Sequence, residues 1–83
     1  MDRSEALETL REAAAEVLGV DTDLITEEAR FKEDLDADSL DLVEFVMALE
    51  ERFDITVPEE DLEGIATIGQ ALDLVLDKVA SKA

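Results

Sequence analysis

The sequence predicts an all-α protein, a small four-helix bundle with three longer helices and one short helix. Apolar residues recur at intervals of three and four over long segments, and no segment shows the alternation of apolar and polar residues typical of strands. The 83 residues are enough for one domain, so we expect residues 1–83 to form a single unit. An apolar content of 47% favours a folded core over disorder, despite a net charge of −17.

The first helix is expected to begin after Asp2 and to stop at Gly19. Asp2 and Glu5 have the spacing of a capping box, and glycine commonly ends a helix. The face that we expect to be buried consists of Leu7, Leu10, Ala14, Val17 and Leu18. A polar connection then runs from about Val20 to Asp38. Its apolar residues are expected to pin it to the core: Leu24, Ile25, Phe31 and Leu35.

The second helix is expected from about Ser39 to Phe53. One arc roughly 100° wide holds a complete core face, made of Leu42, Phe45, Val46, Leu49 and Phe53. Three further apolar residues lie on the far side, beside Glu44 and Glu51: Leu40, Val43 and Met47. An exposed apolar stripe edged by carboxylates indicates a docking surface for a basic, partly apolar partner. The alternative is that these are ordinary scattered apolar residues of a protein surface.

The last part of the chain predicts a short helix and a longer one. Pro58 at a first-turn position, followed by three acids, favours a short helix that reaches Gly64. Thr67 and Gln70 have the spacing of another capping box, which would open the last helix. The apolar side of that helix consists of Ile68, Ala71, Leu72, Val75, Leu76 and Val79.

The charge balance restricts the classes of partner. The chain has 24 acidic residues against 7 basic ones, which disfavours nucleic-acid phosphates and anionic lipid and favours a basic protein surface. It has no cysteine, so disulfides and thiolate metal sites are excluded. No apolar run approaches the roughly 20 residues that span a membrane. The first ten residues lack the pattern of a secretory signal, so we expect a cytoplasmic location.

Catalysis and specific metal binding are both disfavoured. A nucleophilic serine needs an adjacent base, and the chain has no histidine, so we expect a protein that is not an enzyme. Asp34, Asp36 and Asp38 match the opening of a calcium loop of the EF-hand type. Ser39 and Phe45 then stand where that loop needs a glycine and a closing glutamate, so no specific metal site is expected. A non-enzymatic acidic module for protein interaction, or for loose buffering of divalent ions, is an alternative that the composition allows.

Ser39 allows two interpretations. Asp38 is a good N-cap and serine is an ordinary first-turn residue, so Ser39 would then have only a structural role. Alternatively, Ser39 receives a group from another enzyme, because the start of a helix presents the side chain and its dipole suits a phosphate ester. The residues alone leave both interpretations open.

The segment LDADSLDLVEFVMALEERFDITVPEEDL, residues 35–62, resembles the acyl carrier protein family. The resemblance rests on a D-S-L triplet followed at fixed spacing by V-E, by ALEE-x-F and by a segment that ends in proline. This combination is highly specific for the family, and the predicted helices extend the resemblance over nearly the whole chain. In that family the serine of D-S-L carries 4′-phosphopantetheine, which a separate transferase attaches from coenzyme A. The resemblance therefore implies that Ser39 carries this arm.

The resemblance also implies the function. The thiol of the arm would hold acyl groups as thioesters and shuttle them between enzymes of fatty-acid biosynthesis. A carrier of a polyketide or another specialised pathway is the alternative within the family, because D-S-L is shared among these carriers. The ALEERFDI segment and the strong acidity favour the fatty-acid type.

Further residues acquire roles by the same resemblance. The acids that would meet basic surfaces of the transferase and of the synthesis enzymes are Asp38, Asp41, Glu44, Glu50 and Glu51. Leu40, Val43 and Met47 would be the apolar contacts of that surface, and docking to a monomeric carrier would be transient. The acyl chain would withdraw between helices, with Phe45, Val46, Val57, Leu62 and Ile65 as its candidate lining. Asp36 departs from the family pattern, which commonly has glycine there.

Overall fold

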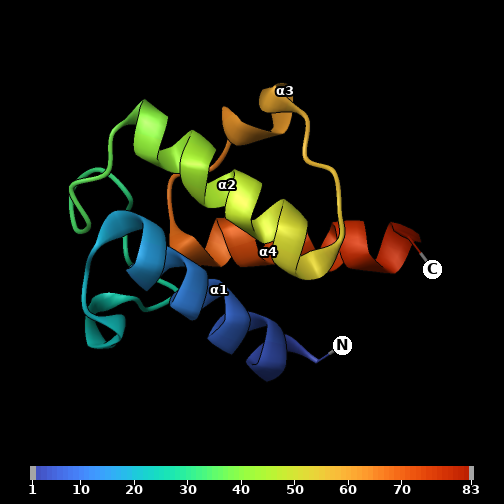
Figure 1. The fold of residues 1–83 in the computed structure, drawn as a ribbon, viewed down its shortest axis with the longest axis horizontal. Helices are drawn as coiled ribbons and strands as arrows, with labels where there is room; N and C mark the ends of the chain where they lie inside the picture. Colours follow the sequence, from blue (N-terminus) through green and yellow to red (C-terminus); the bar gives the residue numbers. More distant parts are fainter. Residues whose placement is uncertain (1, 83) are drawn as a thin grey trace.

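The computed structural model describes residues 2–82 and shows the predicted helical fold (Figure 1). Its helices are α1 (Arg3–Leu18), α2 (Ser39–Phe53), α3 (Glu59–Leu62) and α4 (Ile68–Lys82), with a short 3-10 helix, η1, at Thr22–Leu24. No strand occurs within the described residues, where Arg30 and Thr67 form an isolated bridge. The predicted class of three longer helices and one short helix is therefore confirmed.

Helix α1 begins and ends at the predicted signals. The side chain of Asp2 accepts a hydrogen bond from the Glu5 N–H at 3.0 Å. Gly19 adopts φ 68°, and its N–H donates to the carbonyl of Ala15 at 3.0 Å. A left-handed angle of this kind suits glycine, because it has no Cβ to clash with the backbone.

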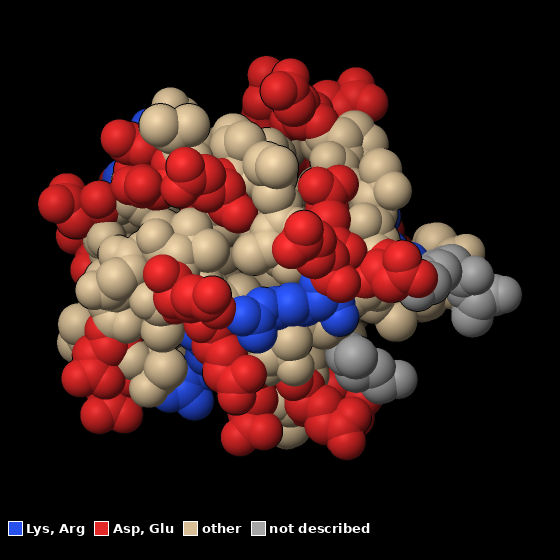
Figure 2. Space-filling view, in the orientation of Figure 1, with Lys and Arg blue, Asp and Glu red and all other residues tan. Residues whose placement is uncertain are grey.

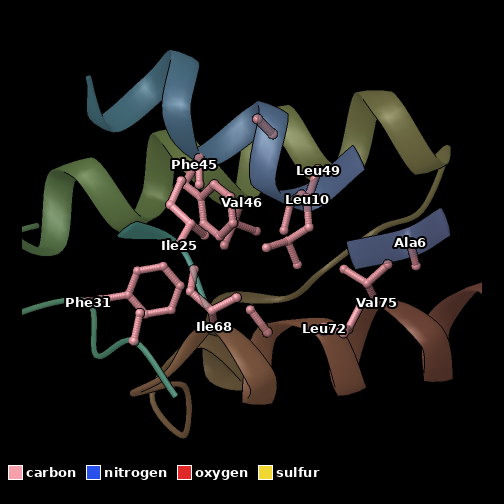
Figure 3. Close-up of a cluster of buried hydrophobic side chains, with 14 of the residues drawn as sticks. Ala6, Leu10, Ile25, Phe31, Phe45, Val46, Leu49, Ile68, Leu72 and Val75 are labelled. Carbon is pink, nitrogen blue, oxygen red and sulfur yellow. The ribbon is translucent and has the colours of Figure 1, made fainter. Parts of the chain in front are cut away.

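The core lies where α1 packs against α2 and α4 (Figure 3). Leu10, Phe45, Leu49, Leu72 and Val75 are among its fully buried side chains. The small residues Ala6 and Ala13 are also buried on α1, although the apolar periodicity did not predict them. Small side chains allow the helices to approach closely, so these alanines belong to the packing surface as much as the leucines do.

The connection between α1 and α2 is held to the core by most of the residues expected to hold it. Ile25, Phe31 and Leu35 are buried, and the Phe31 ring contacts that of Phe45 with centroids 5.5 Å apart. The prediction for Leu24 is wrong, because this residue ends η1 and is 60% exposed. Ile25, the next residue, provides the apolar anchor at this point instead.

Backbone hydrogen bonds join this connection to the start of α4. The N–H of Phe31 donates to the carbonyl of Ala66, that of Ile68 to Ala29, and that of Gly69 to Glu27, at 2.8–3.0 Å. A Cβ added at Gly69 would lie 3.0 Å from the Glu27 carbonyl oxygen, so a side chain there would disturb the approach. Because these backbone polar groups are paired, a long connection that contains only one short 3-10 helix can lie against the bundle.

The short helix α3 differs slightly from the prediction. Pro58 has φ −64° and ψ 150°, so it precedes the helix as its N-cap and does not occupy the first turn. The helix ends at Leu62, two residues before Gly64. An extended ψ keeps Pro58 itself outside the helix, although its fixed φ suits the position next to a helix start.

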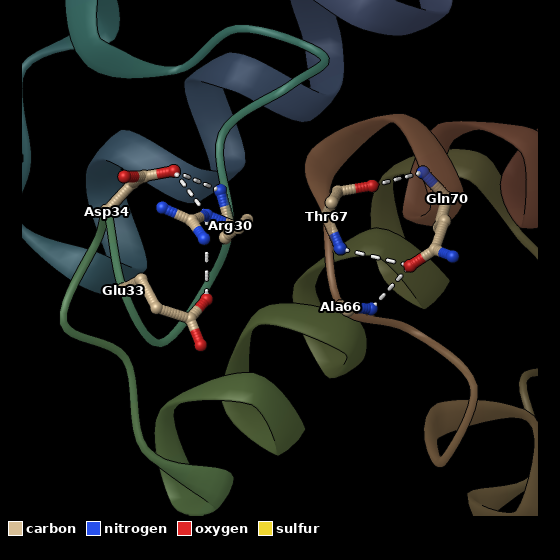
Figure 4. Close-up of polar contacts among 6 residues, drawn as sticks. All are labelled: Arg30, Glu33, Asp34, Ala66, Thr67 and Gln70. Atoms are coloured by element: carbon tan, nitrogen blue, oxygen red, sulfur yellow. Dashed lines mark hydrogen bonds and ion pairs between the residues drawn. The ribbon is translucent and has the colours of Figure 1, made fainter.

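Helix α4 opens with the predicted capping box (Figure 4). The Gln70 N–H donates to Thr67 Oγ1 at 3.2 Å, and Gln70 Oε1 accepts from the N–H groups of Thr67 and Ala66 at 3.1 and 2.6 Å. Ile68, Ala71, Leu72 and Val75 face the core as expected. None of the helices in the described part of the chain is long and apolar enough to cross a membrane.

Candidate functional site

Ser39 is exposed and is the first residue of α2. The helix start is capped by its neighbours, because Asp38 Oδ1 accepts from the Asp41 N–H at 2.9 Å and Asp41 Oδ2 accepts from the Asp38 N–H at 3.3 Å. The prediction that Asp38 provides the cap is confirmed. The hydroxyl of Ser39 is therefore not needed to start the helix, and it remains available at the surface.

A tight turn leads the chain to Ser39. Asp36 adopts φ 52°, and the Ala37 N–H donates to the Phe31 carbonyl at 2.8 Å. Aspartate is one of the residues that tolerate left-handed backbone angles. The glycine expected from the family pattern would have the same conformation at lower steric cost.

The base of this turn is fixed by Arg30 and Asp34 (Figure 4). Asp34 Oδ2 accepts from the Arg30 backbone N–H at 2.8 Å and from Arg30 Nε at 3.3 Å, and Glu33 lies 3.7 Å from the same Nε. The backbone hydrogen bond from Arg30, followed by the bond from its side chain, holds the pKa of Asp34 below its ordinary value. The carboxylates Asp34 and Glu33 in turn raise the pKa of Arg30.

A pocket of about 360 Å³ lies beside Ser39. One part of its wall comes from the turn and from α2, and the other comes from α3 and the segment that follows it. Its apolar lining consists of Phe31, Ala37, Leu42, Leu62, Ile65 and Ala66, and its polar lining consists of Lys32, Glu33, Asp38, Ser39 and Glu63. An apolar pocket with a few polar groups is the usual form of a small-molecule site.

The residues expected to line an acyl pocket occupy two different places. Leu62 and Ile65 line the pocket beside Ser39. Phe45 and Val46 are buried in the core, and Val57 is half-buried and packs against it. The sequence did not predict Phe31, Ala37 or Leu42 as lining residues. Periodicity identifies Leu42 only as a core residue, and no sequence signal shows that the turn before Ser39 faces α3.

The far side of α2 carries the exposed apolar stripe. Leu40, Val43 and Met47 are 64%, 37% and 58% exposed. Glu44 and Glu51 are exposed beside them, and acidic side chains are spread over the face of the molecule shown in Figure 2. This surface therefore combines apolar area with negative charge.

The three other acids assigned to this surface also have partners within the protein. Asp38 and Asp41 form the capping box described above. Glu50 is half-buried, and its Oε2 accepts from the Val57 N–H at 2.9 Å. Substitution of any of these three residues would change the fold locally as well as the surface charge.

The described basic side chains form no ion pairs with the acids assigned to the docking surface of α2. Arg3 pairs with Glu27 and Asp73, and Arg52 pairs with Glu12 and Glu16. Among the side chains that the structure describes, no ion pair involves Asp38, Asp41, Glu44, Glu50 or Glu51. None of these described side chains neutralises the negative charge of that surface, which is therefore open to a basic partner.

Comparison with known proteins identifies the family. Residues 8–75 match the family model described as a phosphopantetheine attachment site. An acyl carrier protein of Rubrobacter xylanophilus is 51% identical over 77 residues, which cover 93% of this chain and 95% of that protein. An acyl carrier protein of Saccharopolyspora erythraea is 50% identical over 96% of this chain and 84% of its own length. The chain belongs to the acyl carrier protein family.

Solved structures of acyl carrier proteins share the fold. The crystal structure of one from Thermotoga maritima matches with a TM-score of 0.87 and 30% identity, over 100% of this chain and 96% of that one. One from Enterococcus faecalis matches with a TM-score of 0.75 and 33% identity, over 94% of this chain and 99% of the other. The matched family model describes phosphopantetheine attachment, so the chain belongs to a family of carriers that bear this group.

Proposed function

We propose that Ser39 is the residue to which 4′-phosphopantetheine is attached. The observation that carries this proposal is the position of Ser39: it is exposed, it begins α2, and the neighbouring aspartates provide the cap that its hydroxyl could otherwise have formed. It also lies within the matched region and lines the apolar pocket. The start of α2 suits a phosphodiester, because unpaired N–H groups and the helix dipole attract anions.

The attachment step depends on a second protein. Ser39 Oγ attacks the phosphorus of coenzyme A that bears the pantetheine group, the Oγ–P bond forms, and the bond to the adenosine bisphosphate breaks. Because the chain has no histidine to accept the hydroxyl proton, we assign that base to the transferase. Once attached, the arm supplies the thiol that this cysteine-free chain lacks and holds acyl groups as thioesters.

The acyl cargo has a binding place next to the attachment point. The pocket has a volume of about 360 Å³, within the range of known small-molecule sites, and most of its lining is apolar. An acyl group that leaves solvent gains about 0.8 kcal/mol for each buried CH₂ group. Burial against Leu42, Leu62 and Ile65 would therefore shelter a chain between successive enzymes.

We assign docking to the acidic and apolar surface of α2. Exposed ion pairs contribute only about 0.2–1 kcal/mol each, so several of them favour fast and reversible association over a permanent complex. Leu40, Val43 and Met47 add apolar contact at the centre of the same surface. This combination suits a monomeric carrier that visits a transferase and several synthesis enzymes in turn.

Fatty-acid biosynthesis in the cytoplasm is the pathway that we propose. The ALEERFDI segment and the net charge of −17 support it. Identification of the thioesters on protein purified from its native cells tests this assignment. Saturated chains and their 3-oxo, 3-hydroxy and 2-enoyl intermediates are expected, whereas chains that retain several oxo or hydroxyl groups would contradict it.

Incubation with coenzyme A and a broad-specificity phosphopantetheinyl transferase tests the attachment site. The intact mass should rise by one phosphopantetheine group, and Ser39→Ala should abolish the increase while leaving helical content unchanged. Ser4→Ala is a matched control, because Ser4 is also exposed and lies in the first turn of a long helix. A mass increase that persists in Ser39→Ala would place the arm on another residue.

A further inference from the structure

Helix α3 forms part of the pocket wall but has few contacts that hold it there. It spans four residues, none of which is buried, and no side chain caps its start. Its last residue, Leu62, lines the pocket together with Ile65 three positions later. Segments with few buried contacts open locally at low cost in free energy, so α3 is the part of the wall that can move most easily.

The two ends of this segment are attached to the rest of the protein. Before α3, the Val57 N–H donates to Glu50 of α2 at 2.9 Å. After α3, the Phe31 N–H donates to the Ala66 carbonyl at 3.0 Å. Movement of the wall is therefore confined to the residues between these two points.

One ion pair joins α3 itself to another helix. Asp61 Oδ2 lies 3.1 Å from Lys78 Nζ of α4, and the two side chains are 33% and 28% exposed. Among the described residues, this is the only ion pair between α3 and a different helix. Because both groups are partly buried, solvent ions screen the pair less than they screen fully exposed charges.

We propose that the Asp61–Lys78 pair is a latch that holds α3 against the pocket and thereby sets the length of acyl chain that the protein shelters. This inference rests on the proposed function of Ser39, because the chain must enter from the arm attached there. With the pair intact, Leu62 and Ile65 keep the pocket near its volume of about 360 Å³. Without it, α3 opens more often and a longer chain can displace Leu62.

Amide hydrogen exchange on the unmodified protein tests the latch. The N–H groups of Asp61 and Ile65 report on it, because they donate to Pro58 and Leu62 within the segment. Lys78→Gln and Asp61→Asn should each speed their exchange by roughly 2- to 5-fold, as expected for loss of one weak ion pair. The double variant should exchange no faster than either single variant, because both substitutions remove the same interaction.

Arg52→Gln provides a matched control. Arg52 also joins two helices through carboxylates, with a side chain 34% exposed, and its loss changes the net charge by the same amount as Lys78→Gln. It pairs with α1 and is not among the residues that line the pocket. Exchange at Asp61 and Ile65 should therefore be unchanged in this variant.

The cargo is tested with protein loaded from saturated acyl-coenzyme A of increasing chain length. In the wild type, Tm should rise with chain length and then level off when the pocket is full. In Lys78→Gln and Asp61→Asn it should level off at a longer chain, and in Arg52→Gln at the wild-type length. Unchanged exchange at α3, equal acceleration in the control, or an unchanged chain-length profile would each overturn the latch. Failure of Ser39 to accept the arm is seen separately, as an absent mass increase.

Discussion

Ser39 is both the first residue of α2 and the proposed attachment point, and the hydrogen bonds that cap the helix do not use its hydroxyl group. The side chains of Asp38 and Asp41 satisfy each other's N–H groups, so the hydroxyl between them is not part of the cap. If serine were the cap, modification would remove a hydrogen bond that the helix needs. The capping box therefore allows Ser39 to be modified at little cost in stability.

Asp36 gives a test of the turn that precedes Ser39. Its φ of 52° is strained for most residues, so Asp36→Ala should lower the free energy of unfolding by about 1 kcal/mol. Asp36→Gly removes the same charge but also the steric conflict, so it should be as stable as the wild type or slightly more stable. Urea unfolding of the three proteins measures the difference. Equal stability of the alanine and glycine variants would show that the turn is not strained.

Asp34 gives a pH-dependent test of the same turn. Its pKa is lower in the folded protein than in the unfolded chain, so its contribution to stability is present above the ordinary aspartate pKa of about 3.9 and is lost as pH falls through the folded pKa. The stability difference between wild type and Asp34→Asn should therefore be greatest near neutral pH and shrink below pH of about 4. Arg30→Gln should have a smaller effect, because the backbone N–H of residue 30 still donates. A difference independent of pH would contradict the assignment.

One face of helix α2 packs in the core, and the opposite face is the proposed docking surface. Phe45, Val46 and Leu49 fill the core from one face, while Leu40, Val43 and Met47 are exposed on the other. The acids beside the exposed residues have no ion-pair partners in the described part of the chain. A change of charge on this outer face should therefore affect docking far more than folding.

Glu44→Lys tests that separation. Lysine and glutamate have similar helix propensity, so helical content and Tm should hold or rise slightly as the net charge falls. The rate of transferase modification at low substrate should drop by roughly 2- to 10-fold at low ionic strength, and the loss should shrink in high salt. Glu8→Lys, an exposed reversal on α1, should have a much smaller effect. Equal rates for wild type and Glu44→Lys at low salt would remove α2 as the recognition surface.

Met47→Ala separates the apolar part of docking from the charged part. Met47 is 58% exposed, so its truncation should leave the fold intact. Modification should slow because apolar burial against the partner is lost, and the loss should depend little on salt. Initial rates measured over a range of salt concentrations distinguish this behaviour from that of Glu44→Lys. A strong salt dependence for Met47→Ala would contradict the apolar role.

The elements that sequence reasoning placed well are those with local signals. Asp2, Gly19 and the Thr67–Gln70 pair mark helix ends through interactions between near neighbours, and the structure uses them as predicted. Leu24 was misplaced because its exposure depends on the 3-10 turn that it ends. The resemblance placed Leu62 and Ile65 in an acyl pocket, and both line the pocket beside Ser39. The contribution of Phe31 and Ala37 could not be predicted, because it depends on the contact of the turn before Ser39 with α3 and the segment after it, and periodicity carries no information on that contact.

At the scale of the whole molecule, charge is distributed unevenly. The net charge is −17, and several of the few basic side chains hold segments together: Arg3 of α1 pairs with Glu27 and with Asp73 of α4. The remaining acidic side chains, which outnumber the basic ones, are therefore spread over the rest of the surface. This excess favours solubility and basic partners, and it lowers the stability of the compact state through repulsion.

Salt should therefore stabilise the protein. Added sodium chloride, or millimolar magnesium at constant ionic strength, should raise Tm because both reduce repulsion between carboxylates. A gain of about 1 kcal/mol corresponds to roughly 4–8 °C in a domain of this size. Differential scanning calorimetry over a salt series measures the effect. A Tm independent of both additions would show that repulsion contributes little.

The most direct test of the central claim is the location of the arm on protein purified from its native cells. Cleavage after Lys32 and Arg52 by trypsin releases residues 33–52, in which Ser39 is the only residue with a hydroxyl group. Tandem mass spectrometry should find phosphopantetheine, free or acylated, on this peptide and localise it to Ser39. Phosphopantetheine on a different peptide, or a native protein that carries none, would contradict the account.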